Sequence, residues 1–175
     1  LTKWFDTNYH YLVPELTADQ QFTLSSQRLF DEVREAQALG HAVKAVIIGP
    51  LTYLWLSKSH GGDFERLDLI ERLLPVYAQV LQQLADLGVT WVQVDEPILS
   101  LDLPAAWQAA FESAYNRLQT RSINVLLTTY FGPLADNLWL ASRLPVAGLH
   151  IDVTRSGDEW RRVIDNLSEY KVLSL

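Results

Sequence analysis

Short apolar runs rich in β-branched residues alternate with amphipathic stretches along this chain. Five of these runs are apolar nearly throughout, which is typical of parallel strands covered on both faces. They occupy residues 45–49, 91–97, 123–132, 146–154 and 171–175. A sixth run, with less apolar character, opens the chain at residues 3–11. The pattern therefore predicts six strands.

Between these runs, apolar residues recur at the spacing of one helix face. The predicted helices cover residues 25–40, 63–75, 75–88, 104–118, 134–144 and 157–167. Ser25 or Ser26 is a candidate N-cap, and Gly40 and Gly88 stand where a helix C-terminus favours glycine. Proline suits the first turn of a helix better than its interior, so Pro75 is expected to end one helix and begin another.

Strands that alternate with helices predict an α/β fold with parallel pairing and right-handed crossovers. An open doubly wound sheet and a (β/α)8 barrel both fit. Neither G-x-G-x-x-G nor a P-loop occurs, which favours the barrel over a nucleotide-binding sheet. A complete barrel takes about 250 residues. We therefore expect residues 1–175 to form one partial (β/α)8 TIM-barrel domain, with about six of the eight strands and two open edges.

The chain begins at Leu1 and contains no methionine, so a segment of a longer protein is expected. Fourteen Lys and Arg residues against 21 Asp and Glu give a net charge of −7. Nucleic acids and anionic membranes need a clustered positive surface, so neither is an expected partner. The longest apolar stretch, residues 45–56, is too short to span a bilayer, and no signal-peptide pattern opens the chain. Cytoplasm is the expected compartment.

Residues that are mostly polar follow the predicted strands, where active sites of such folds form. They are Asp6, Asn8, His10, Gly49, Pro50, Thr52, Asp95, Glu96, Thr128, Thr129, Tyr130, His150 and Asp152. A ring of site residues is one interpretation. The other is that strand-to-loop junctions are commonly polar and that these side chains cap the next helix.

Two pairs of residues in this ring carry the strongest chemical signal. Asp95 and Glu96 are adjacent in a strand and point to opposite faces, so they do not form a glycosidase pair across one bond. His150 and Asp152 are two apart and are expected on one face, as a His-carboxylate unit or as two metal ligands. A third ligand would have to come from His10, Asp95 or Glu96. The absence of cysteine excludes disulfides and thiolate ligands within the chain.

Several segments resemble, in order along the whole chain, the cobalamin-independent methionine synthases. The most specific is T-K-W-F-D-T-N-Y-H-Y-L-V-P-E-L at residues 2–16, and the others lie at 47–58, 73–99, 126–132 and 148–153. These enzymes, the 5-methyltetrahydropteroyltriglutamate–homocysteine methyltransferases, contain two (β/α)8 barrels. The chain resembles the interior of the N-terminal barrel.

The resemblance implies methyl transfer from 5-methyltetrahydropteroyltri-L-glutamate to homocysteine, which forms methionine. In the family, zinc activates the homocysteine thiol on His, Cys and Glu ligands of the C-terminal barrel, because the metal lowers the thiol pKa. That barrel is not in this chain. The segment is therefore expected to bind no metal, to hold no catalytic residue and to be inactive alone, with the C-terminal barrel of the same protein as its partner.

The resemblance also implies that this segment helps to bind the folate polyglutamate tail. The family's tail-binding lysine and asparagine correspond to Lys3 and Asn8. A tail of carboxylates needs a cation, and an asparagine amide donates to carboxylate or carbonyl oxygens. His10, Asp95, Glu96, His150 and Asp152 are interpreted as vestigial or structural strand-end residues.

Two other hypotheses remain open. A self-standing barrel hydrolase or lyase would use Asp95, Glu96, His150 and Asp152 around a mouth lined with aromatic residues. A non-catalytic fragment would fold only by pairing its open sheet edges with another copy.

Overall fold

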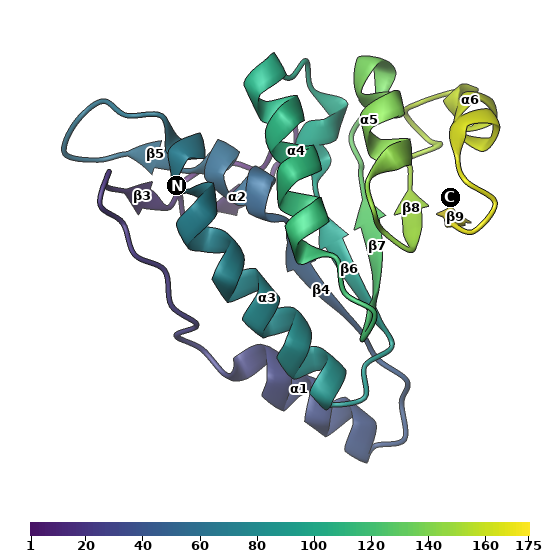
Figure 1. The fold of residues 1–175 in the computed structure, drawn as a ribbon, viewed down its shortest axis with the longest axis horizontal. Coiled ribbons are helices and arrows are strands. Elements are labelled where there is room, and N and C mark those ends of the chain that lie inside the picture. Colours follow the sequence, from purple (N-terminus) through teal and green to yellow (C-terminus); the bar gives the residue numbers. More distant parts are fainter.

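The computed structural model describes residues 1–175 and confirms the α/β class. Its main sheet has five parallel strands in the order β4-β6-β7-β8-β9. Their arrows run side by side in Figure 1. The strands are β4 (Lys44–Ile48), β6 (Trp91–Asp95), β7 (Asn124–Thr128), β8 (Gly148–His150) and β9 (Val172–Ser174). Each coincides with one of the five strongly apolar runs, so those five predictions are confirmed.

Six helices accompany the strands. They are α1 (Arg28–Ala38), α2 (Pro50–Leu56), α3 (Ile70–Asp86), α4 (Ala105–Leu118), α5 (Leu138–Arg143) and α6 (Glu159–Asn166). Three short 3₁₀ turns precede α3, α4 and α5: η1 (Arg66–Leu69), η2 (Pro97–Ser100) and η3 (Ala135–Asn137). None of the helices has the length and apolar character needed to cross a membrane.

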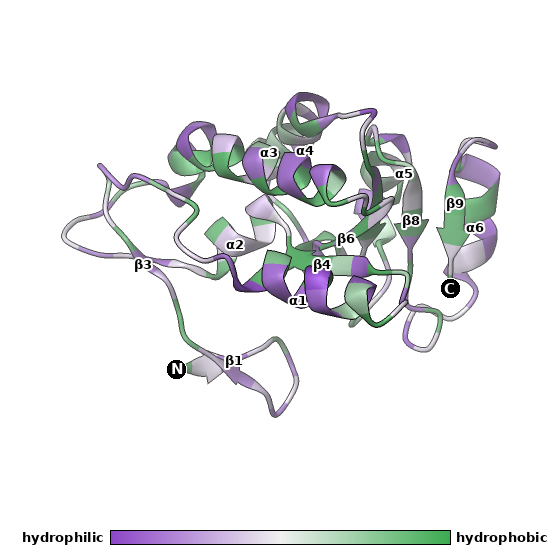
Figure 2. Ribbon diagram, turned by 90° about the horizontal axis from the view of Figure 1, so that it is seen from below, coloured by the Kyte–Doolittle hydropathy of each residue, from purple (hydrophilic) through white to green (hydrophobic).

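The helices cover the sheet on one face. In β6, Val92 and Val94 are buried, whereas Trp91, Gln93 and Asp95 alternate with them and are half-buried. Figure 2 shows α3 and α4 as a layer on one side of the sheet. The expectation that the strands are covered on both faces is therefore wrong for β6, whereas β7 is buried on both faces at Leu126, Leu127 and Thr128.

The strands follow one another across the sheet in chain order, with no reversal. A doubly wound sheet reverses its strand order at a switch point, whereas a barrel winds in one direction. The two outer strands, β4 and β9, leave two edges of the sheet unpaired. This topology is that of a (β/α) segment winding one way, and the closed eight-stranded barrel stays a prediction.

The prediction that Pro75 separates two helices is wrong, because α3 continues through this residue. Proline removes only one backbone hydrogen bond, the one from position 75 to the carbonyl of residue 71. Apolar side chains on both sides of Pro75 continue the same buried face, with Leu73 before it and Leu81 and Leu84 after it. Packing of this face outweighs the lost hydrogen bond.

The predicted strand over residues 3–11 is also wrong. The segment forms a small antiparallel hairpin of β1 (Thr2–Lys3) and β2 (His10–Tyr11), separate from the main sheet. Figure 2 shows β1 on the side of the molecule away from α3 and α4. A second two-stranded pair, β3 (Glu15–Leu16) with β5 (Lys58–Ser59), lies next along the chain. The main sheet therefore has five strands, not six.

Candidate functional site

The register of the main sheet brings three predicted site residues into one row. Asp95 of β6 is paired with Thr128 of β7, and Thr128 is paired with His150 of β8. Neighbouring strands lie about 4.8 Å apart, so the row spans two strand spacings on the face that the helices leave open. It combines a carboxylate, a hydroxyl and an imidazole at the carboxyl ends of the strands.

Asp95 is held by two donors at this edge. Its Oδ1 accepts a hydrogen bond of 2.9 Å from the Gln93 amide, and its Oδ2 accepts one of 3.2 Å from the Tyr130 hydroxyl. Burial raises the pKa of Asp95, and the two hydrogen bonds oppose this rise. Asp95 thus faces the open side of the sheet as an acceptor, as expected from the alternation of strand residues.

Glu96 points the other way, into the core, and is fully buried. Its carboxylate accepts hydrogen bonds from the backbone N–H groups of Leu51 and Thr52 (3.2 and 2.8 Å), at the start of α2. The hydroxyls of Thr52 and Tyr115 also donate to it, at 2.6 and 3.0 Å. Burial raises the pKa of Glu96 to about 7, although these donors favour the charged form. These hydrogen bonds join the start of α2 to the end of β6. Because Glu96 is buried, it cannot reach a substrate, and it cannot be a catalytic residue of the hydrolase considered above.

His150 and Asp152 do not form the expected pair. Strand β8 ends at His150, whose Nδ1 lies 2.9 Å from the Ser174 hydroxyl. Burial lowers the pKa of His150, which favours the neutral ring. Ile151 between them is buried, so the alternation of the strand continues to Asp152, whose charge opposes the fall in the pKa of His150. Asp152 is occupied by donors of the loops, however, and no hydrogen bond joins it to His150. Their shared face stays a prediction.

Asp152 organises the loops after β7 and β8. Its Oδ2 accepts from the Phe131 N–H (3.1 Å), and its Oδ1 accepts from the N–H groups of Thr154 (3.0 Å) and Arg155 (3.3 Å). The Thr154 hydroxyl donates to Oδ1 at 2.6 Å and, as the largest cause, lowers the pKa of Asp152. This carboxylate has a structural role, as the sequence interpretation allowed.

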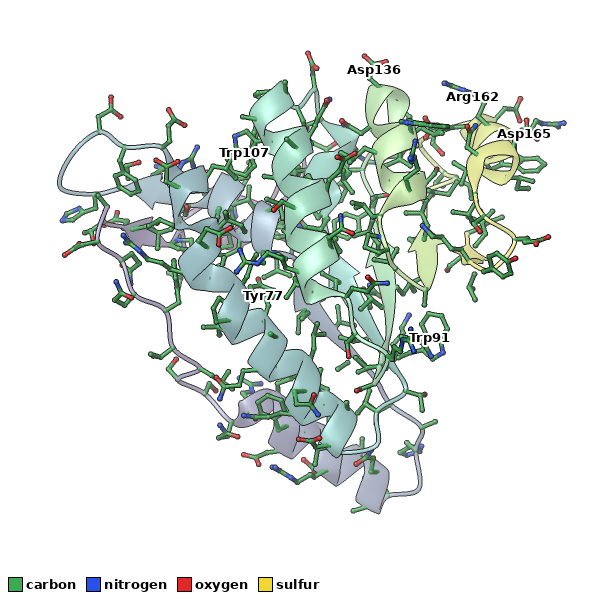
Figure 3. The ribbon with its side chains drawn as sticks, viewed as in Figure 1. Tyr77, Trp91, Trp107, Asp136, Arg162 and Asp165 are labelled. Atoms are coloured by element: carbon green, nitrogen blue, oxygen red, sulfur yellow. The ribbon has the colours of Figure 1, made fainter.

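Replacing Asp152 with alanine is expected to loosen both loops and the hairpin that rests on them. Loss of these bonds should cost about 1–2 kcal/mol of unfolding free energy. Hydrogen exchange should rise in residues 4–11 and 130–156 and stay unchanged in β6. Asp165→Ala, an exposed carboxylate on α6 (Figure 3), is the matched control. Equal exchange in the two variants would contradict this role of Asp152.

The hairpin that carries Lys3, Asn8 and His10 docks on these same loops. The ring of Phe5 lies 5.3 Å from the ring of Phe131 between centroids, and Arg155 forms a 2.7 Å ion pair with Asp6. The other end of the hairpin is tied to α2, because the Tyr11 hydroxyl donates to the Leu56 carbonyl at 3.0 Å.

The three predicted site residues of the hairpin are all exposed. Lys3 and His10 face each other across the two strands as a register pair. Asn8 lies in the connecting turn, and its carbonyl is 3.1 Å from His10 Nδ1, which therefore donates to it. These residues stand on the docked hairpin and outside the row of strand ends, which separates the predicted ring into two groups.

Two phenylalanines at the docking contact have an uncommon backbone conformation. Phe5 has a φ of +50° and Phe131 a φ of +77°. The left-handed region costs an ordinary L-residue roughly 1–2 kcal/mol, and it is rarer still for a bulky side chain. Because both residues lie in one contact, the surrounding hydrogen bonds and ring packing must hold the hairpin and the loop in place.

The residues of this chain do not fit a zinc site. No three His, Cys, Asp or Glu side chains come together to hold a metal ion. The candidates for such a site are used otherwise: Glu96 is buried against α2, Asp152 accepts backbone donors, and His10 stands apart on the hairpin.

Sequence reasoning missed Arg155, although it identified the neighbouring Asp152. Arg155 pairs with a residue 149 positions away, and nothing in the local pattern points to that partner. Gly132-Pro133 predicts a turn beside Phe131, but nothing local signals the contact of Phe131 with Phe5.

The fold and the site define a parallel α/β domain whose strands follow one another in chain order, with polar residues at the strand ends and a hairpin docked on the loops after β7 and β8. The profile of the family described as "Cobalamin-independent synthase, N-terminal domain" matches residues 1–175, so the chain belongs to this family. Among solved structures, a methyltransferase from Methanosarcina mazei is similar, with a TM-score of 0.47 and 14% identity over 79% of this chain. The similar region spans 44% of that protein's length.

Proposed function

We propose that this chain is part of the N-terminal (β/α)8 barrel of a zinc-dependent, cobalamin-independent methionine synthase. The parent enzyme transfers the methyl group of 5-methyltetrahydropteroyltri-L-glutamate to homocysteine and forms methionine. Family membership over residues 1–175 is the observation that carries this proposal. The zinc belongs to the C-terminal barrel of the same protein, in the cytoplasm, and this segment binds the folate tail and supports that barrel.

Lys3 and Asn8 are the proposed ligands of the polyglutamate tail. Both are exposed on the hairpin, and His10 is paired opposite Lys3. An ammonium group and an amide N–H are suitable donors to carboxylates. The net charge of the chain is −7, so attraction of an anionic tail depends on such local cations.

The proposed role of Lys3 predicts a kinetic effect that depends on tail length. In the full-length enzyme, Lys3→Ala should raise KM for the triglutamate substrate about ten-fold and leave kcat within about two-fold, because one charge-assisted contact is lost in both ground and transition states. The monoglutamate should respond much less. Steady-state kinetics with both substrates measure KM and kcat.

Arg121→Ala removes one exposed positive charge at the other end of the sheet, before β7, and serves as the control. If Lys3→Ala raises KM equally for both substrates, or raises it no more than Arg121→Ala does, Lys3 does not bind the tail.

A further inference from the structure

Arg155 is a third basic residue at the hairpin, and its position is set by the fold. Its guanidinium lies 5.6 Å from the ring centre of Phe131 and forms the ion pair with Asp6. Asp152 accepts its backbone N–H at 3.3 Å and so fixes the base of the side chain. The side chain is still 48% exposed, which leaves part of the guanidinium open to solvent.

The donors of Arg155 are only partly used. A guanidinium has five N–H donors, and the contact with Asp6 joins Nη1 to a single carboxylate oxygen. The Asp6 side chain is itself 63% exposed and lies in the turn of the hairpin, between Lys3 and Asn8 in sequence. Arg155 therefore lies against the turn that carries Asn8, and Asp6 is the carboxylate that a ligand on Arg155 would displace.

Other charged groups of these loops do not compete for Arg155. The Asp152 carboxylate is occupied by donors from Phe131, Thr154 and Arg155. The hairpin pairs Lys3 with His10 and adds no second carboxylate near its turn. Asp6 is thus the one side chain that holds this guanidinium through an ion pair.

We propose that Arg155 is a further binding residue for a carboxylate-rich ligand and that Asp6 occupies its guanidinium until the ligand arrives. This inference rests on the proposed function, in which the ligand is the folate polyglutamate tail. A tail carboxylate replaces the Asp6 carboxylate on Arg155, so the number of ion pairs is conserved and Asp6 turns to solvent. Lys3 and Asn8 bind one part of the tail and Arg155 binds the next.

The test measures dissociation constants of 5-methyltetrahydropteroyl-triglutamate and of the monoglutamate with the full-length enzyme, by isothermal titration calorimetry. Arg155→Gln should weaken triglutamate binding about five-fold and leave the monoglutamate nearly unchanged, because a charge-assisted contact to the distal tail is lost. Asp6→Asn should strengthen triglutamate binding about three-fold, since it removes the competing charge.

Arg162→Gln is the matched control. Arg162 is an exposed arginine on α6 (Figure 3), and its removal changes the net charge by the same amount. If Asp6→Asn weakens triglutamate binding, the Asp6–Arg155 ion pair only holds the hairpin in place, and the inference is overturned.

The outcomes also separate this inference from the proposed function. If Lys3→Ala discriminates between the two tail lengths while Arg155→Gln behaves like Arg162→Gln, tail binding stands and the role of Arg155 fails. If neither Lys3→Ala nor Arg155→Gln discriminates, both fail together.

Discussion

Gly49→Ala is expected to destabilise the protein by about 3 kcal/mol or more, through overlap with a side chain that cannot move. A Cβ atom at position 49 would overlap the carboxylate of Glu96, well inside van der Waals contact. Glu96 is fully buried and accepts four hydrogen bonds, so a shift would leave buried donors unpaired. The backbone of Gly49 (φ −75°, ψ 154°) suits any residue, so the whole cost is steric. Urea unfolding followed by circular dichroism measures it.

Gly132→Ala is the control for this effect. Its added Cβ would lie 3.6 Å from the Cβ of Ser100, which is ordinary van der Waals contact. Its unfolding free energy should stay within about 1 kcal/mol of the parent value. Equal stability of the two variants would show that Glu96 has room to move and that the contact at Gly49 is not tight.

The second large effect is a pH dependence that comes from Glu96. Burial raises its pKa from an ordinary value of 4.5 to about 7 in the folded chain. The folded state therefore binds the proton more tightly than the unfolded state does. The resulting stabilisation is complete below about pH 4.5 and is lost as the pH rises through 7, with a total of about 3 kcal/mol.

Glu96→Gln isolates this contribution, because glutamine does not titrate. The difference in unfolding free energy between the parent and the variant should be largest below about pH 4.5 and should shrink by about 3 kcal/mol by pH 8. The other carboxyl groups titrate alike in both proteins, so their contributions to the unfolding free energy cancel in the difference. Urea titrations at four pH values give the curve. A difference that stays constant, or grows with pH, would mean that Glu96 is ionised throughout this range.

The sheet could be predicted because its signal is local. Each main strand is a continuous apolar run bounded by helical periodicity, and packing against the helices requires that composition. Residues 3–11 lack it, and their polar and aromatic side chains pair in a hairpin instead. Pro75 misled the helix prediction because a proline rule describes one backbone bond, whereas the buried face that holds α3 together is set by many tertiary contacts.

The site could be predicted only in part, for the same reason. Strand alternation correctly placed Asp95 and Glu96 on opposite faces, because both lie at or directly after the regular end of β6. It could not show that Asp152 is occupied by donors of the loops instead of forming a hydrogen-bonded unit with His150. The docking of the hairpin depends on contacts between residues 5 and 131 and between residues 6 and 155, and no periodicity within a short window encodes such distant partners.

The distance in sequence between Asp6 and Arg155 also sets an order of events during folding. Their ion pair closes a loop of 149 residues, which is nearly the whole chain. Contacts of such separation lose the most chain entropy on closure and form after local ones. On the ribosome, the hairpin leaves the exit tunnel before its docking site does, so it has nothing to dock on until β7, β8 and the turn at residue 155 have been synthesised. The hairpin is therefore synthesised before these loops but reaches its place only after them.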